Sequence, residues 1–106
     1  MTPFTEKVIA IIQRIPTGKV MTYGQVARHA GSPRAARQVV RILHSMSRSY
    51  HLPWHRVINA KGQIALRDDE SYQEQRMSLE AEGVMVGLHG GIDLEKYLWE
   101  PACMEH

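Results

Sequence analysis

Residues 22–48 read TYGQVARHAGSPRAARQVVRILHSMSR, and this stretch decides the fold. Thr22 with Gln25 three positions later forms a capping-box pattern, which predicts a helix over 23–30. A Gly-Ser-Pro run follows it. Glycine ends helices and serine followed by proline begins them, so a second, longer helix is predicted over 33–47. Two helices joined by so short a connection are typical of a helix-turn-helix unit.

Shorter elements are predicted on both sides of this pair, from apolar periodicity and from the capping residues Thr2, Asp68, Asp69 and Asp93. They are a helix over 3–15, a loop over 48–56, a hairpin with strands at 57–58 and 64–66, a helix over 70–82 and a last short turn through 97–99. The expected fold is therefore mainly α with a small β hairpin, organised as a winged-helix-like DNA-binding domain. Because 106 residues is less than a typical domain length of roughly 150, one domain over 1–106 is expected.

Charge is unevenly distributed along the chain. The whole sequence carries a net charge of +2, yet residues 1–56 hold nine Lys or Arg against one acid, and residues 57–106 hold four against ten. Such polarity indicates one surface made for a polyanion, with nucleic acid as the first candidate. No apolar run approaches the roughly 20 residues that span a bilayer, and no secretory signal is visible, so neither a membrane nor secretion is expected.

The second helix of the pair carries a stripe of basic side chains. On a helical wheel the stripe falls within an arc of about 80°, and its members are Arg34, Arg37, Arg41, His44 and Arg48. Cations in this arrangement bind phosphates and release condensed counterions. The alternative is a solvated polar face, which is the commoner meaning of surface charge.

Within this stripe, the motif Arg34-Ala35-Ala36-Arg37 is more specific. Two alanines let a helix approach the wall of a DNA groove closely, while arginine can enter a groove or the base stack. Readers of the major groove usually carry several amide or hydroxyl side chains for base edges, and here only Gln38 offers one. A sequence-specific transcriptional regulator is therefore a weaker interpretation of this helix pair.

The segment Pro53-Trp54-His55-Arg56-Val57 resembles the Pro-Cys-His-Arg-Val segment of the O6-alkylguanine-DNA alkyltransferases, with tryptophan in place of the reactive cysteine. Further matching segments occur in the same order, and they are IPTGKV at 15–20, Thr22-Tyr23, GSPRAAR at 31–37 and Glu82-Gly83. The chain is thereby identified as a member of the alkyltransferase-like proteins, the non-catalytic branch that resembles the C-terminal domain of the repair enzyme.

The chemistry agrees with a non-catalytic protein. Alkyl transfer needs a thiolate activated by a nearby base, which the enzymes obtain from a Cys-His-Glu relay. His55 and Glu82 match two members of that relay, but the indole of Trp54 is no nucleophile. We expect the histidine and the glutamate to be structural. Cys103, the single cysteine, lies in a short tail and is expected to have no role, and neither a metal nor a cofactor is expected. Met46 stands where the enzymes commonly have an asparagine.

The resemblance implies how the protein meets DNA. The recognition helix would enter the minor groove, with Arg34, Ala35 and Arg41 at the interface. The damaged guanine would rotate out of the duplex, which costs least where pairing is already weakened. Arg37 matches the arginine finger that fills the vacated stack, and Tyr23 matches the tyrosine that crowds the phosphate of the flipped nucleotide and reaches its base.

The resemblance also implies a base pocket. Leu43 matches a position that packs on the purine. Trp54 and Val57 would line the pocket and offer backbone carbonyls to the exocyclic amine. Arg67 matches the arginine that lies against the flipped base, where a guanidinium can stack and donate to O6. Its alternative is a turn-side arginine that pairs with one of the two aspartates after it.

The sequence thus predicts a protein that binds O6-alkylguanine in double-stranded DNA, flips the base without repairing it and flags the lesion for nucleotide excision repair proteins. A cytoplasmic location, nucleoid-associated in a bacterium, goes with this role. The principal alternative is a degenerate or weakly active DNA alkyltransferase.

Overall fold

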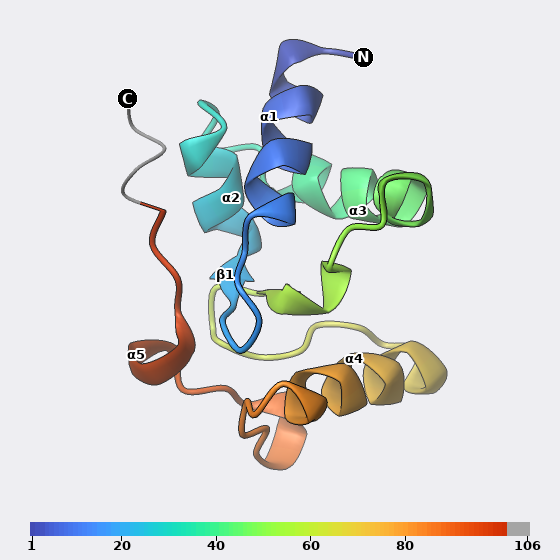
Figure 1. The fold of residues 1–106 in the computed structure, drawn as a ribbon, viewed down its shortest axis with the longest axis vertical. Helices are drawn as coiled ribbons and strands as arrows, with labels where there is room; N and C mark the ends of the chain where they lie inside the picture. The colour runs from blue at the N-terminus through green and yellow to red at the C-terminus, as the bar shows by residue number, and fades with distance from the viewer. Residues whose placement is uncertain (102–106) are drawn as a thin grey trace.

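The computed structural model describes residues 1–101 as a mostly helical fold with one small sheet (Figure 1). Cys103 lies outside the described residues. The α-helices are α1 (Pro3–Gln13), α2 (Tyr23–His29), α3 (Ala36–Tyr50), α4 (Asp69–Ala81) and α5 (Leu94–Tyr97). The remaining elements are β1 (Met21–Thr22), β2 (Val57–Ile58) and two 3-10 turns, η1 (Trp54–Arg56) and η2 (Leu88–Gly90). The mainly α fold class is confirmed.

Four of the predicted capping residues begin helices, whereas Asp69 is itself the first residue of α4. The side chains of Thr2, Asp68 and Asp93 accept hydrogen bonds from backbone N–H groups of the first turns of α1, α4 and α5. At α2 the capping box is complete, because Thr22 Oγ1 accepts from the Gln25 N–H at 3.0 Å and Gln25 Oε1 accepts from the Thr22 N–H at 3.2 Å. These starts were readable in the sequence because a cap depends only on near neighbours along the chain.

The second helix of the pair differs from its predicted range of 33–47, since α3 starts at residue 36 and continues to residue 50. The Ser32 carbonyl accepts from the Ala35 N–H at 2.9 Å, so the Ser-Pro pair forms a separate turn before the helix. At the other end, His51 takes the left-handed conformation (φ 52°, ψ 45°) and the Leu52 N–H donates to the Ser47 carbonyl at 2.9 Å. The predicted loop over 48–56 is accordingly wrong at its start, and it contains η1.

The predicted hairpin is also wrong. β2 pairs in parallel with β1, with Met21 opposite Val57, and residues 64–66 form no strand. The side chain of Asn59 closes a turn by accepting from the N–H groups of Lys61 and Gln63, which produces a hairpin-like pattern in the sequence. The chain then leaves in another direction, and Ile64 donates to the distant Gly90 carbonyl at 3.1 Å.

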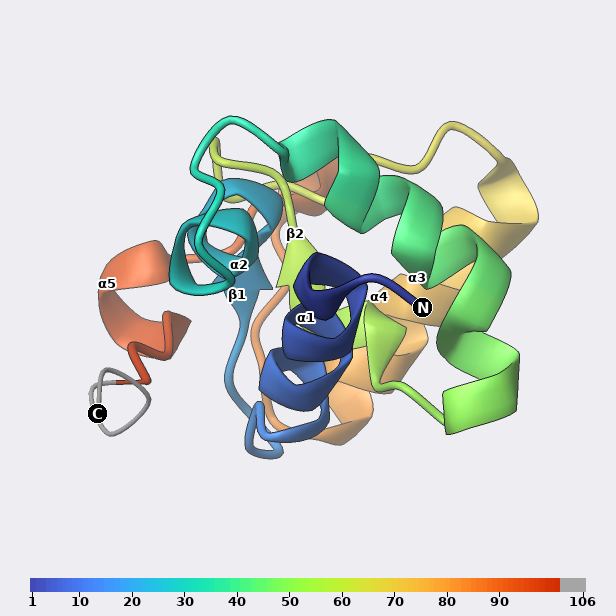
Figure 2. The same ribbon diagram turned by 90° about the horizontal axis from the view of Figure 1, so that it is seen from above.

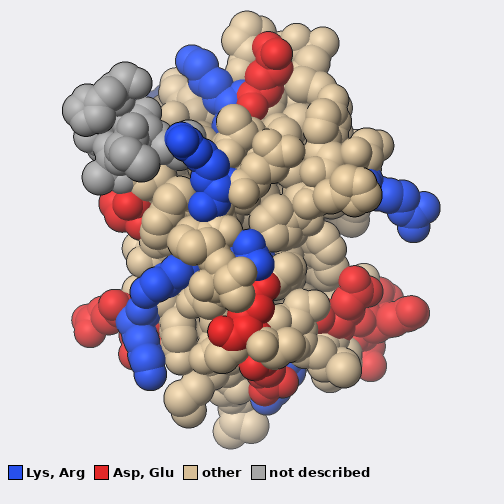
Figure 3. Space-filling model, in the orientation of Figure 1, with Lys and Arg blue, Asp and Glu red and all other residues tan. Residues whose placement is uncertain are grey.

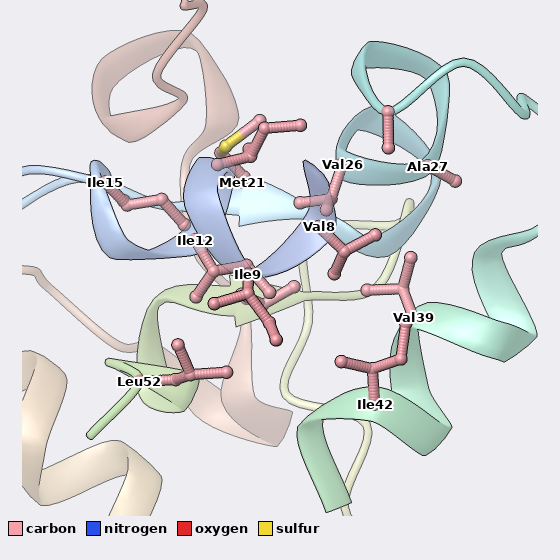
Figure 4. Packing of buried hydrophobic residues seen from close by; sticks show 13 residues of the cluster. Val8, Ile9, Ile12, Ile15, Met21, Val26, Ala27, Val39, Ile42 and Leu52 are labelled. Carbon is pink, nitrogen blue, oxygen red and sulfur yellow. The ribbon is translucent and has the colours of Figure 1, made fainter. Parts of the chain in front are cut away.

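Two apolar clusters hold the elements together, one on each side of the β1–β2 pair. Figure 4 shows the first, in which side chains from α1, α2 and α3 point toward one another; those labelled are Val8, Ile9, Ile12, Ile15, Met21, Val26, Ala27, Val39, Ile42 and Leu52. The second joins α4 to the C-terminal segment through Val20, Ile58, Ile64, Leu79, Val84, Val86, Ile92 and Tyr97. Burial of such side chains contributes roughly 1.5–3 kcal/mol each, and α3 takes part in the first cluster through Val39 and Ile42.

α2 and α3 pack against each other as the expected helix-turn-helix pair, and Figure 2 shows α3 running along one side of the molecule. Residues 54–58 lie between α3 and α4 (Figure 1). On the face shown in Figure 3, acidic side chains gather at the lower right, over the start of α4. No helix within residues 1–101 is long and apolar enough to cross a membrane.

Candidate nucleic-acid interface

A groove with a volume of about 600 Å³ opens at the start of α3, and three arginines line it. Arg34, Arg37 and Arg41 are all exposed, and the groove also contains Ala35 and Gln38. Within residues 1–101, none of the three arginines has an acidic partner within 4 Å. Three exposed and unneutralised guanidinium groups beside one concave surface provide the charge that a nucleic-acid backbone requires.

The alanines of the same motif are small, so they add little side-chain bulk to the surface at the start of α3. Ala35 occupies the N-cap position of α3 and offers no side-chain hydrogen bond to the first turn. The start of α3 is therefore not covered by a capping side chain, and the positive end of the helix dipole adds to the charge of Arg34 and Arg37. Four of the residues predicted to contact DNA therefore lie together in this groove: Arg34, Ala35, Arg37 and Arg41.

A second cavity, with a volume of about 650 Å³, opens between α2, α3 and α4. It brings together Tyr23, Leu43 and Trp54, three residues that are far apart in the sequence and were predicted to share a pocket. Tyr23 comes from the first turn of α2, Leu43 from the middle of α3 and Trp54 from η1. A volume of this size exceeds that of a purine base, and the lining combines aromatic and aliphatic side chains with polar ones.

Two residues predicted for this pocket are placed differently. Val57 is fully buried, and its side chain belongs to the first core cluster rather than to the cavity wall. Arg67 is exposed and does not line the cavity, whereas its neighbour Leu66 does. Arg67 makes no ion pair within 4 Å with Asp68 or Asp69 among the interactions of residues 1–101, so its guanidinium is not held by either aspartate.

Sequence reasoning missed much of the cavity wall. From α4 it is lined by Ser71, Glu74 and Gln75, and the remaining lining residues are Val40, His44, Ser47, Arg48, His51, Leu52 and Leu66. The α4 residues lie at spacings of three and four, so they share one face of that helix. The sequence predicts a helix over 70–82, but the proximity of this face to α3 arises only in the folded chain.

Glu82 forms hydrogen bonds that hold the segment carrying Trp54 in place. His55 Nε2 lies 2.7 Å from Glu82 Oε2, and Arg56 donates to the same carboxylate from Nε at 3.0 Å and from Nη2 at 2.7 Å. The Gly18 N–H donates to Glu82 Oε1 at 2.9 Å. Arg56 also donates from Nη1 to the Ile15 carbonyl at 2.8 Å. This half-buried network ties η1 to the end of α4 and to the loop after α1.

The same network sets the charge state of Glu82. Burial by itself would raise the pKa of the carboxyl group, but hydrogen bonds from Arg56, the Gly18 N–H and His55 outweigh it and lower the pKa to about 2. Glu82 is therefore ionised at neutral pH. At Tyr23, burial raises the pKa of the phenol, so its hydroxyl stays protonated and can donate a hydrogen bond.

The cavity has room for a flat aromatic group. Among the described residues that line the cavity there is no thiol, and His55, the one relay histidine, is bonded to Glu82 outside the cavity lining. Within residues 1–101, no group of three His, Cys, Asp or Glu side chains is placed to hold a metal ion.

Comparison with known proteins adds a family likeness. Residues 3–84 match the family model described as 6-O-methylguanine DNA methyltransferase, DNA binding domain. The chain is 51% identical over 96 residues to a DNA base-flipping protein of Escherichia coli, covering 91% of this chain and 74% of the relative. It is 41% identical over 106 residues to Alkyltransferase-like protein 1 of Schizosaccharomyces pombe, covering 95% and 98% of the two chains.

Solved structures show the same likeness. S. pombe Atl1 in complex with damaged DNA containing O6-carboxymethylguanine is similar with a TM-score of 0.85 at 40% identity, covering 95% of this chain and 98% of that one. The Mycobacterium tuberculosis O6-methylguanine methyltransferase is similar with a TM-score of 0.62 at 28% identity, covering 91% of this chain but 55% of the enzyme.

Proposed function

The chain belongs to the family of the 6-O-methylguanine DNA methyltransferase DNA-binding domain and, within it, to the alkyltransferase-like proteins. We propose that it binds O6-alkylguanine in double-stranded DNA through the minor groove and holds the flipped base in the cavity between α3 and α4 without removing the alkyl group. The observation that carries this proposal is the position of Trp54 in the cavity wall. By the sequence resemblance, this tryptophan stands where the enzymes have their reactive cysteine.

α3 links the DNA-facing groove to the cavity. Its first turns carry Arg37 and Arg41 in the groove, and its later turns carry Leu43 in the cavity wall. A duplex held by the arginines therefore lies beside the opening into which a base must turn. Arg37 enters the stack in place of the extruded base, while Arg34 and Arg41 hold the phosphates and Ala35 allows close approach.

Each residue predicted for the base pocket has a distinct role in this proposal. Tyr23 packs beside the rotated phosphate and donates its hydroxyl to the base. Leu43 and Trp54 provide the apolar surfaces against which the purine rests. The Trp54 carbonyl accepts from the exocyclic amine. The Val57 carbonyl, which is fully buried and already accepts from Gln75 Nε2, must be uncovered before it can do the same. Arg67 reaches the cavity mouth from the position next to Leu66, and there it stacks on the base.

No covalent step follows binding. Trp54 has no nucleophilic sulfur, and its indole nitrogen lends its lone pair to the ring. His55 and Glu82, which would activate a thiol in an enzyme, serve with Arg56 to hold η1 in place. We propose that the unrepaired complex then marks the lesion for nucleotide excision repair proteins. The chain would do so as one domain, in the cytoplasm or, in a bacterium, at the nucleoid.

Paired titrations test the proposal. Two duplexes of identical sequence, one with guanine and one with O6-methylguanine at the central position, are titrated at a stated salt concentration, because salt alone changes affinity for DNA strongly. The proposal predicts clearly tighter binding of the duplex with O6-methylguanine. Equal affinities would favour a general DNA-binding protein instead.

A further inference from the structure

Gln75 is buried in the cavity wall, with 1% of its surface exposed. Its side-chain Nε2 donates two hydrogen bonds, one to the His55 carbonyl and one to the Val57 carbonyl, both at 3.1 Å. Because both acceptors are carbonyl oxygens, the orientation of the amide is fixed: turned over, it would place oxygen against oxygen. One side chain of α4 therefore holds the main chain on both sides of Arg56.

The oxygen of this amide makes no comparable hydrogen bond. Gln75 Oε1 is buried and accepts no hydrogen bond from any group of residues 1–101. An unpaired buried acceptor lowers stability, so the chain keeps an amide here at a cost. What the amide adds over an apolar side chain of similar shape, such as methionine, is the pair of N–H donors to the two carbonyls.

The segment of residues 54–57 is thus held from two directions. Glu82 binds its side chains, those of His55 and Arg56, and Gln75 binds its backbone carbonyls. Alkylation of O6 leaves N1 of the base without its hydrogen, so the exocyclic 2-amine is the only N–H donor on the pairing edge of the lesion. Backbone carbonyls of fixed direction suit that donor.

We propose that Gln75 is a positioning residue: by holding the His55 and Val57 carbonyls it fixes the main chain beside Trp54, the residue of segment 54–57 that lines the cavity, so that the Trp54 carbonyl accepts the 2-amine of the flipped base. This inference rests on the proposed function, because it concerns the same cavity. In this inference, recognition of the 2-amine depends on Gln75 of α4. Gln75 does not contact the base and acts only by positioning the backbone.

The test varies both the base and the residue. Wild type, Gln75→Met and Gln73→Met are titrated with duplexes that contain O6-methylguanine or O6-methylhypoxanthine, which lacks the 2-amine. Gln73 is exposed on the same helix and serves as the matched control. Wild type and Gln73→Met should prefer the aminated lesion by about tenfold, the worth of one well-formed hydrogen bond. In Gln75→Met this preference should fall to about twofold or less, with little change for the lesion without the amine.

Other outcomes overturn the inference. A Gln75→Met variant that keeps the tenfold preference, or that weakens both lesions equally, would reduce Gln75 to a packing residue. Equal affinity of wild type for the two lesions would do the same without any variant. If Gln75→Met does not fold, the wild-type complexes decide: the side-chain ¹⁵N resonance of Gln75 should differ between the two lesions, and identical resonances contradict the inference. Failure of wild type to prefer O6-methylguanine over guanine would instead refute the proposed function.

Discussion

Arg56 donates to the carboxylate of Glu82 from Nη2 at 2.7 Å and from Nε at 3.0 Å, in a two-pronged contact between half-buried side chains. This pair fixes η1, and with it Trp54, against the end of α4. Two-pronged contacts between arginine and a carboxylate are among the stronger hydrogen-bonded pairs in proteins, because both groups are charged and planar.

The first prediction concerns acid. Glu82 has a pKa of about 2 in the folded protein, against an ordinary value of 4.5, so its contribution to stability is fully present above pH 4.5 and is lost as the pH falls toward 2. After allowance for solvent screening, the loss should be about 2 kcal/mol in the free energy of unfolding. Urea unfolding at several pH values measures it.

Glu82→Gln provides the matching variant. It should lower the free energy of unfolding by about 2 kcal/mol at pH 7 and much less near pH 2, where wild-type Glu82 is itself losing its charge. Glu80→Gln is the control, because Glu80 is more exposed and lies 3.6 Å from Arg76 in a surface pair worth under about 0.5 kcal/mol. Parallel stability curves for wild type and Glu82→Gln across this pH range would contradict the assignment.

Arg37 and Arg41 line the same groove but should respond differently to substitution. Arg37→Ala should cost about 1–3 kcal/mol on lesion DNA, because the flipped state loses the group that replaces the base. Arg41→Ala should weaken lesion and normal DNA alike and reduce the salt slope by about one unit. Titrations at several salt concentrations separate these effects. Two variants that lose the same affinity and change only the salt slope would show Arg37 to be an ordinary phosphate contact.

Tyr23 should act mainly through its ring. Tyr23→Phe keeps the bulk beside the rotated phosphate and should keep most base extrusion, whereas Tyr23→Ala should lose it. A fluorescent base analogue at the lesion position reports extrusion, and thermal melting checks that both variants are folded. Full extrusion by Tyr23→Ala would exclude this role and leave Tyr23 as a support for the start of α2.

Arg67 is exposed and free of either neighbouring aspartate, so its substitution should leave stability unchanged. If its guanidinium stacks on the flipped purine, Arg67→Ala should cost about 1–2 kcal/mol on O6-methylguanine DNA and much less on undamaged DNA. Paired titrations with a melting curve measure both quantities. An unchanged ratio of lesion to normal affinity would remove Arg67 from the pocket.

The fold was predictable where it depends on near neighbours. Thr22 and Gln25 indicate the start of α2, because the capping box is formed by two residues that lie three positions apart in the sequence. The prediction of a hairpin was wrong for the opposite reason. The strand partner of Val57 is Met21, and no local pattern specifies a parallel pairing between residues so far apart in the sequence. The turn closed by Asn59 has the composition of a hairpin loop, but the segments on its two sides do not pair as hairpin strands.

The site divides in the same way. The sequence resemblance predicted that Tyr23, Leu43 and Trp54 meet, and the cavity brings them together. The contribution of α4 was missed, because Gln75 meets the His55 and Val57 carbonyls only once two separate segments have packed. Its signal in the sequence is a glutamine at a buried position of an amphipathic helix, which periodicity alone cannot distinguish from an exposed one.

The central claim is that the protein holds an alkylated base without accepting the alkyl group. The most direct measurement incubates the protein with a stoichiometric amount of O6-methylguanine duplex, under conditions where titration shows full binding, and determines the intact protein mass. The account predicts an unchanged protein mass, with the methylated base recovered from the DNA. A gain of one methyl group by the protein, with guanine restored in the duplex, would contradict it.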